Sequence, residues 1–142
     1  MLKNFTVIEV ISSKTKAQLS FYPNKFKFNQ FTAPDLENPP YVQFLIDTNG
    51  KNFAIRVCEK TDENALAFVK RKQSAKPYPV SLSCPIAAEM IANLMDWHDD
   101  SKYYVIPGQK FPDEKAIVFN LNDADEFQIT TRPTPLGNDN EE

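Results

Sequence analysis

Nine cationic side chains in the first 76 residues have the chemistry needed to bind phosphate groups. They come from separate stretches of the chain, and in KFKFN at residues 25–29 lysine alternates with phenylalanine. If these cations meet on one exposed face of a sheet, they would displace counterions from a nucleic-acid backbone. The candidate binding residues are Lys14, Lys16, Lys25, Lys27, Arg56, Lys70, Arg71, Lys72 and Lys76.

Two aromatic residues near these lysines, Phe21 and Tyr22, would stack on exposed bases, as binding of single strands requires. Arginine is scarce, and bidentate arginine is the commonest specific reader of guanine, so backbone or single-strand binding is favoured over sequence-specific duplex recognition. Two other interpretations of the lysines stay open. They would solvate one face of a sheet whose interior the phenylalanines fill, or they would bind an anionic protein surface.

The net charge of −3 hides an uneven distribution along the chain. Residues 1–76 contain twelve Lys and Arg against seven Asp and Glu, whereas residues 77–142 contain four against twelve. This polarity is typical of a nucleic-acid face with an acidic counterpart, or of an unevenly solvated surface. It also permits an alternative function, in which the acidic half imitates nucleic acid and occupies the cleft of a basic host protein.

Catalytic motifs are missing from the sequence. Neither a phosphate-binding glycine loop nor a hydrolase or zinc-protease signature is present, and the three glycines are scattered at positions 50, 108 and 137. Cys58 and Cys84 have no metal-type spacing, and we expect both to be small buried apolar residues. A nucleophilic role for Cys58 would need a base within reach, whereas the alternation of FAIRVCE places it toward the core.

The lone histidine lies in MDWHDD, where His98 is surrounded by Asp96, Asp99 and Asp100. These groups would hold a cation or let His98 act as a base, but a helix that ends in solvent predicts the same residues. A hydrolytic metal site needs ligands from several elements, and there is no second histidine. We therefore predict a protein that is not an enzyme and that has no metal or cofactor.

Composition predicts one globular α+β domain over residues 1–131 and a flexible acidic tail over 132–142. The charged fraction is 25%, and eleven prolines, three glycines and eleven phenylalanines favour short elements and a β-rich interior. The sequence has no run of about 20 apolar residues that would cross a bilayer and no secretory signal, so we expect a cytoplasmic protein without membrane contact.

Alternation and β-branched or aromatic content predict a series of short strands. We expect the first two to form a hairpin, and Asn49-Gly50 to form a tight primed turn with positive φ angles between two later strands. The expected strands cover residues 5–12, 17–22, 25–29, 41–47, 51–59, 65–72, 79–83, 103–108, 116–121 and 126–130.

Two helices are expected between these strands. A short one covers about 32–38, with Thr32 as its cap and a stop at the two prolines 39 and 40. The main helix covers about 84–97, with Ser83 as its cap and Pro85 in its first turn. Its apolar residues predict one face that lies on the sheet: Ile86, Met90, Ile91, Leu94 and Trp97.

The order strand, helix, strand, strand occurs twice, at residues 24–58 and 79–121, through true duplication or by chance. The first unit, from KFKFN through YVQFLID to FAIRV, resembles the AbrB/SpoVT swapped-hairpin regulators, whose interleaved dimers bind DNA. This resemblance implies that a second copy would let one chain imitate the dimer. The order KFKFN, PPYVQFLID, FAIRV, MDW, YYVIPG, AIVFNL is also similar to small uncharacterised proteins of Firmicutes and their mobile elements.

These observations predict a non-enzymatic protein, monomer or homodimer, that binds nucleic acid through its basic N-terminal half. The resemblance implies a regulator carried by a phage or mobile element. The alternative is a protein–protein interaction module or inhibitor whose acidic C-terminal half mimics nucleic acid. The first hypothesis depends on the cations of distant segments meeting on a single face.

Overall fold

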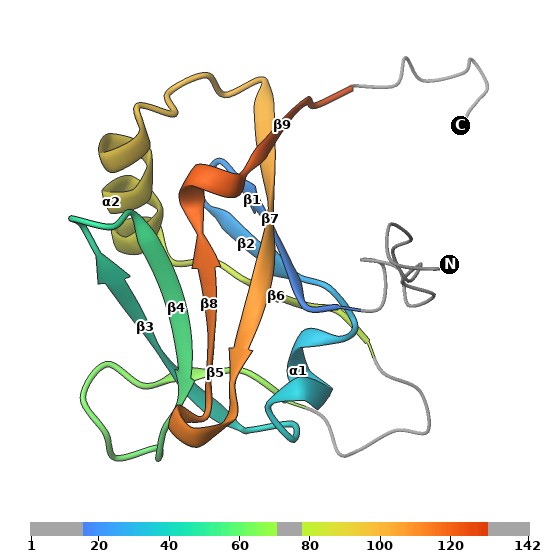
Figure 1. The fold of residues 1–142 in the computed structure, drawn as a ribbon, viewed down its shortest axis with the longest axis vertical. Coiled ribbons are helices and arrows are strands. Elements are labelled where there is room, and N and C mark those ends of the chain that lie inside the picture. Colours follow the sequence, from blue (N-terminus) through green and yellow to red (C-terminus); the bar gives the residue numbers. More distant parts are fainter. Residues whose placement is uncertain (1–15, 71–77, 131–142) are drawn as a thin grey trace, which may run out of the picture.

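In the computed structural model of this protein, residues 16–70 and 78–130 are described, and they form a β-rich α+β fold (Figure 1). The helices are α1 (Thr32–Asp35) and α2 (Pro85–Met95), with 3-10 turns η2 (Pro112–Glu114) and η3 (Leu121–Asp123). The strands are β1 (Gln18–Tyr22), β2 (Lys25–Phe28), β3 (Tyr41–Asp47), β4 (Asn52–Val57), β5 (Leu66–Ala67), β6 (Val80–Leu82), β7 (Lys102–Phe111), β8 (Ala116–Asn120) and β9 (Asp125–Gln128). The strand expected at 5–12, its hairpin and the tail lie outside the described residues.

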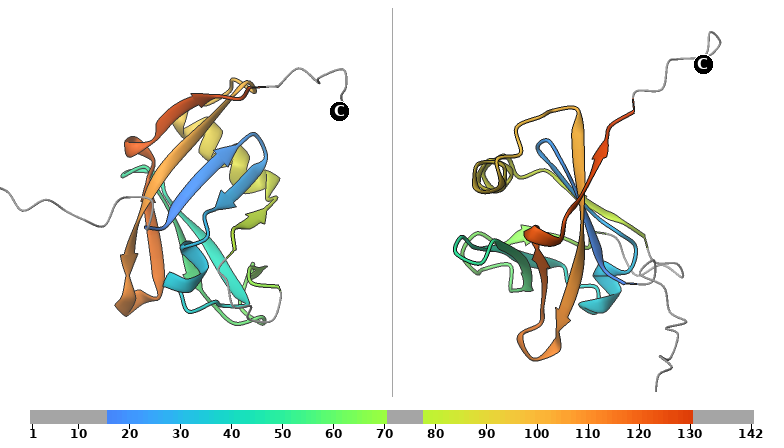
Figure 2. Two further views of the ribbon diagram at one scale, coloured as in Figure 1. Left: turned by 90° about the vertical axis from the view of Figure 1, so that its right-hand side faces the viewer. Right: turned by 45° about the horizontal axis from the view of Figure 1, so that its top comes forward.

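The strands form one antiparallel sheet in the order β5-β3-β4-β8-β7-β1-β2-β6, and β9 pairs with β7. The sheet curls into a half barrel, and α2 lies beside its open part (Figures 1 and 2). This confirms the α+β class. Among the described residues, no helix is long and apolar enough to cross a membrane.

Phenylalanines from opposite parts of the curled sheet meet in its interior. The rings of Phe26 on β2 and Phe53 on β4 have centroids 5.3 Å apart, and Phe28 lies 5.9 Å from Phe119 on β8. The expected alternation of β2 is confirmed, because Phe26 and Phe28 are fully buried while Lys25 and Lys27 are exposed. Since β2 and β4 face each other across the core, their outward side chains point in opposite directions.

Strand β7 is longer than the expected 103–108 and connects the two parts of the sheet. It pairs with β1 and β9 over its first half and with β8 over its second half. Gly108 makes this path possible, because a Cβ there would lie 2.8 Å from Ile117 Cγ2 and from Phe119 Cε1. A glycine therefore lets the strand continue where it lies closest to the core.

Helix α2 packs on the inward side of β2, and it lies behind β1 and β2 in Figure 2 (left). Its buried residues are Ala88 and Ile91, and the Trp97 ring after it stacks on Tyr104 with centroids 3.8 Å apart. The expected apolar face is wrong in part, because Ile86 and Met90 are 75% and 45% exposed. The helix approaches the sheet along a stripe centred on small Ala88, so these two larger residues lie outside the contact.

Both expected helix caps are wrong. The residue before α1 is Phe31, and Thr32 is the buried first residue of the helix, whose hydroxyl donates to Asn29 Oδ1 over 2.9 Å. The residue before α2 is Cys84, and the Ser83 hydroxyl donates instead to the Asn24 carbonyl at 3.3 Å. In each case the hydroxyl bonds a residue that flanks β2, either Asn29 directly after this strand or Asn24 directly before it. The helices are also shorter than expected, and α1 is a single turn.

The turn between β3 and β4 is not the expected primed type. Asp47 and Asn52 form the last pair of the ladder, so four residues make the loop, and the left-handed residue is Lys51 with φ 59°. The Asp47 carboxylate accepts hydrogen bonds from the backbone N–H groups of Asn49 and Gly50 at 3.2 and 3.1 Å. The carboxylate thereby stabilises a wider loop than Asn-Gly alone predicts.

Candidate nucleic-acid interface

The outward side chains of β2, β1, β7 and β9 form a continuous surface, which we name the aromatic–lysine face. On β1 and β2, Tyr22 lies opposite Lys25 and Ser20 lies opposite Lys27. On β7 and β9, Tyr103 lies opposite Phe127. Figure 2 (left) shows this part of the sheet from the side away from α2. The face consists of Ser20, Tyr22, Lys25, Lys27, Tyr103, Val105, Asp125 and Phe127.

Three aromatic rings cross the aromatic–lysine face as one stack. The centroids of Tyr22 and Tyr103 are 4.6 Å apart with planes at 10°, and those of Tyr103 and Phe127 are 5.4 Å apart at 23°. These spacings are close to the ~4.8 Å between neighbouring strands, so the rings stand side by side on the sheet. Phe127 is 44% exposed and lies on the outermost strand of the stack.

Lys25 and Lys27 are the cations of this face. Both are exposed, and among the described residues no carboxylate oxygen lies within 4.0 Å of either ammonium group. Asp125 is the acid of the face, opposite Val105 and two residues from Phe127 on the same strand. The lysines and the acid therefore lie at opposite ends of the ring stack.

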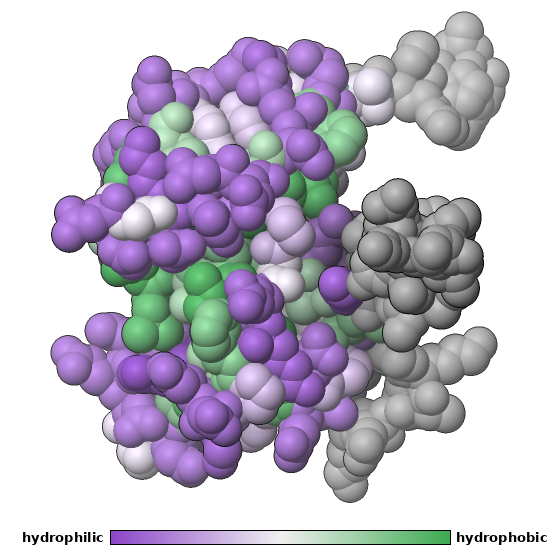
Figure 3. Space-filling view, viewed as in Figure 1, coloured by the Kyte–Doolittle hydropathy of each residue, from purple (hydrophilic) through white to green (hydrophobic). Residues whose placement is uncertain are grey.

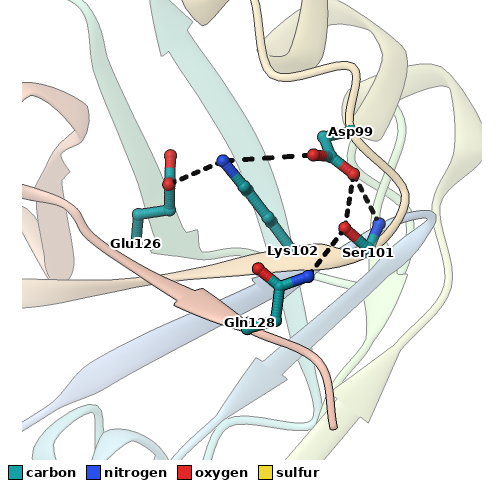
Figure 4. Close-up of polar contacts among 5 residues, drawn as sticks. All are labelled: Asp99, Ser101, Lys102, Glu126 and Gln128. Carbon is teal, nitrogen blue, oxygen red and sulfur yellow. Dashed lines mark hydrogen bonds and ion pairs between the residues drawn. The ribbon is translucent and has the colours of Figure 1, made fainter. Parts of the chain in front are cut away.

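A polar network on the inward side of β9 holds this strand in place (Figure 4). Lys102 Nζ lies 2.8 Å from Glu126 Oε2 and 3.9 Å from Asp99 Oδ2, so it connects β9 to the loop after α2. Gln128 Nε2 donates to the Ser101 hydroxyl over 3.0 Å, and Ser101 donates to Asp99. Phe127 lies between Glu126 and Gln128 on the same strand. By holding these two residues on the inward side, the network fixes the backbone that carries the outward ring of Phe127.

The ionisation of these groups follows from their contacts. Hydrogen bonds from the side chain and then the backbone of Ser101 lower the pKa of Asp99. The hydrogen bond to Glu126 raises the pKa of Lys102 above its usual range. On the outward side, partial burial and then the neighbouring Tyr103 raise the pKa of the Tyr22 hydroxyl. The raised pKa keeps the Tyr22 hydroxyl neutral at physiological pH.

Of the nine expected binding residues, the structure brings Lys25 and Lys27 together with Tyr22. Lys16 is exposed two residues before β1, where its carbonyl accepts a hydrogen bond from Asn29. Arg56 points outward from β4, which lies across the core from β2, and it donates a hydrogen bond to Gln43 Oε1 over 2.8 Å. Lys70 is exposed three residues after β5. Outside the described residues lie Lys14, Arg71, Lys72 and Lys76.

Among the aromatic candidates, Phe21 is not available for stacking on bases. Phe21 is only 4% exposed and points to the opposite face of the sheet from Tyr22. Its ring centroid lies 5.2 Å from that of Phe26 in the core. The sequence reasoning missed Tyr103 and Phe127. The alternation in the closing strands places both outward, but which strands become neighbours is set by the long-range pairing of β7.

The other chemical candidates do not form a site. His98 Nε2 lies 3.5 Å from Asp96 Oδ1 on the surface, and the described residues contain no group of three or more side chains placed to hold a metal ion. Cys58 is half-buried and lines a cleft of about 510 Å³ between α1, the start of β3 and the β7–β8 turn. Burial and then the nearby Asp62 raise the pKa of its thiol, which keeps it protonated.

No protein-family model matches the chain, and neither the curated proteins nor the solved structures that were compared contain a match.

Proposed function

We propose that this chain is a non-enzymatic protein that binds nucleic acid on the aromatic–lysine face. The observation that carries the proposal is the position of Lys25 and Lys27, whose charges have no carboxylate partner among the described residues, next to the ring stack of Tyr22 and Tyr103. Ammonium groups beside aromatic side chains are the combination that backbone and single-strand binding uses. As its biological role we propose a regulator carried by a phage or mobile element.

Attraction to nucleic acid must be local in this protein. The described residues contain ten Lys and Arg against fifteen Asp and Glu, so their overall charge repels phosphates. Arg56 cannot assist Lys25 and Lys27, because it points away from them on the opposite wall. Two phosphate contacts predict a weak salt dependence, with a slope of about −1.4 in log K against log salt for a single strand.

Charge reversal tests this function. We expect the double variant Lys25→Glu, Lys27→Glu to lose binding of a fluorescein-labelled oligonucleotide, measured by fluorescence anisotropy at low salt. The matched control is Arg56→Glu, Lys60→Glu, which changes the net charge equally on exposed residues away from the face. Equal loss in both variants, or no binding by the unaltered protein at any salt concentration, would refute the proposal.

We also propose that residues 24–58 and 79–121 are two copies of one unit, related by a pseudo-two-fold axis. In support, β2 pairs with β6 and β4 pairs with β8, so each antiparallel pair joins equivalent strands of the two units. Ala54 faces Val118 at the centre of the second pair, 64 positions further along the chain. One chain would then imitate the dimer of the AbrB/SpoVT regulators that it resembles.

The backbone at the two hairpin turns gives further support to this duplication. Lys51 and Lys115, also 64 positions apart, both have left-handed backbones with φ of 59° and 51°. Their carbonyls accept reciprocal hydrogen bonds, from Leu121 N to Lys51 O and from Val57 N to Lys115 O, both 2.9 Å long. Such matched contacts are typical of a two-fold relation, because each end repeats the other.

The acidic surface favours a second candidate function, in which the protein mimics nucleic acid and binds a basic host protein. The exposed carboxylates of the second half include Asp96, whose side chain is 94% exposed, and four others: Glu89, Asp100, Asp113 and Asp123. In that case the protein would bind no oligonucleotide and would displace DNA from a defined DNA-binding protein in a competition assay. Failure to compete would leave this candidate without support.

A further inference from the structure

We infer that the ligand of the aromatic–lysine face is single-stranded nucleic acid, with one base stacked on the outer ring surface of Phe127. This inference rests on the proposed function and names the ligand class of the same site. Two independent features carry it. The ring stack has one open end, and the charges are divided between its two ends.

The geometry of the stack leaves one ring surface available to a base. Tyr22 and Tyr103 cover each other at 4.6 Å, and Phe127 covers the other side of Tyr103 at 5.4 Å. Beyond Phe127 there is no further paired strand in the described residues, because β9 pairs with β7 alone. A planar base would therefore extend the stack as its fourth member.

A base can extend the stack only if its own faces are free. In a duplex the neighbouring base pairs cover both faces, whereas the bases of a single strand can separate and stack on aromatic side chains. The inner network of Lys102 and Glu126 holds β9 in place before any ligand arrives. Because the ring of Phe127 is positioned in advance, stacking requires little additional ordering of the protein.

The charges on the face orient the strand. Asp125 lies beside Phe127 and repels phosphates, while Lys25 and Lys27 attract them at the other end of the stack. We therefore place a base at β9 and the phosphates over β2. Three strand spacings of about 4.8 Å, or about 14 Å in total, separate these ends, a distance that a strand of about four nucleotides spans.

Truncation of the terminal ring tests the stacking. We expect Phe127→Ala to weaken binding of a labelled hexanucleotide single strand by at least about fivefold, the lower end of the effect of one stacked base. The salt slope should stay unchanged, because no phosphate contact is lost. Phe127→Trp keeps a ring at this position, should retain binding, and allows the stacked base to quench its fluorescence. The matched control is Phe111→Ala, since Phe111 is similarly exposed at 39% on the other end of β7.

Ligand length and charge provide two more measurements with the same assay. Affinity should rise with single strands of two, three and four nucleotides and then level off, and a matched duplex should bind less tightly. Asp125→Asn removes the carboxylate and should tighten single-strand binding. Equal effects of Phe127→Ala on duplex and single strand would overturn the inference.

The outcomes separate this inference from the proposed function. If Phe127→Ala and Phe127→Trp both bind like the unaltered protein while Lys25→Glu, Lys27→Glu does not, the stacking site is wrong and backbone binding stands. If the unaltered protein binds no oligonucleotide, both proposals fail. Binding to a neutral oligosaccharide instead would show that the ring stack serves a different ligand and would also refute this inference.

Discussion

Phe28 shows how a residue at the centre of the fold can be recognised from sequence. It alternates with Lys25 and Lys27 at the two-residue period of a strand, so one face had to be wet and the other buried. The structure places its ring at the centre of the core, with its centroid 5.5 Å from the ring centroid of Phe68 and 5.9 Å from that of Phe119. The alternation predicts the direction of each side chain, but it does not identify the distant rings that it meets.

Replacement of Phe28 tests its place in the core. We expect Phe28→Ala to lower the free energy of unfolding by about 3–5 kcal/mol, because a fully buried ring leaves a cavity among neighbouring rings. Lys27→Ala, on the adjacent outward position, should change it by less than about 0.5 kcal/mol. Urea unfolding followed by tryptophan fluorescence measures both. A small effect of Phe28→Ala would mean that the core is not packed as described.

The elements were predictable to the extent that they depend on local pattern. Strands β3, β4 and β8 lie where the alternation predicts them, but the caps and the turn at Asn49-Gly50 differ because other groups compete for the same backbone atoms. Thr32 bonds Asn29 instead of its own helix, and Asp47 organises a wider loop. These contacts are local, but several groups within a few residues compete as partners, and residue preferences do not tell which contact forms.

The position of β9 should depend on pH, since charged groups hold it. Because the pKa of Asp99 is lowered, the stabilisation of β9 by this carboxylate is complete above the ordinary pKa of 3.8. It is lost as the pH falls through the lowered pKa. Because the pKa of Lys102 is raised, the stabilisation of β9 by this ammonium group is complete below the ordinary pKa of 10.5. It is lost as the pH rises through the raised pKa.

Hydrogen exchange of the Ile129 amide, which donates to the Ser101 carbonyl over 2.7 Å, reports on this position. We expect its protection factor to be constant between these limits and to decline in acid below about pH 4. The variant Asp99→Asn should reduce the acid decline while the protein remains folded. A protection factor that does not change in acid would show that the network does not hold β9.

At the scale of the whole molecule, the decisive feature is the curvature of the sheet. The sequence correctly suggests outward lysines on β2 and an outward Arg56 on β4, but the curl places them on opposite walls. Hydrophobic residues also cross the middle of the side shown in Figure 3, between hydrophilic regions above and below. Which strands become neighbours depends on pairing over long sequence distances, and local alternation carries no information about it.

The proposed duplication predicts equal behaviour at its two equivalent turns. A left-handed backbone is unfavourable for lysine and acceptable for glycine, so Lys51→Gly and Lys115→Gly should each raise the free energy of unfolding by about 0.5–1 kcal/mol. Thermal unfolding would then show increases in Tm of about 2–4 °C for each kcal/mol. Opposite signs for the two variants would show that the turns are not equivalent.

The incomplete closure of the half barrel leaves strand edges at its two ends. Within the described part of the chain, β5 pairs with β3 and β6 pairs with β2, so the far side of each presents unpaired N–H and C=O groups. β5 and β6 are only two and three residues long, but β5 pairs with Tyr41 and Val42 alone, so residues 43–47 of β3 and the outer side of four-residue β9 are edges as well. Each of these edges is short and offers few backbone groups to another chain, which limits edge-to-edge aggregation at high concentration.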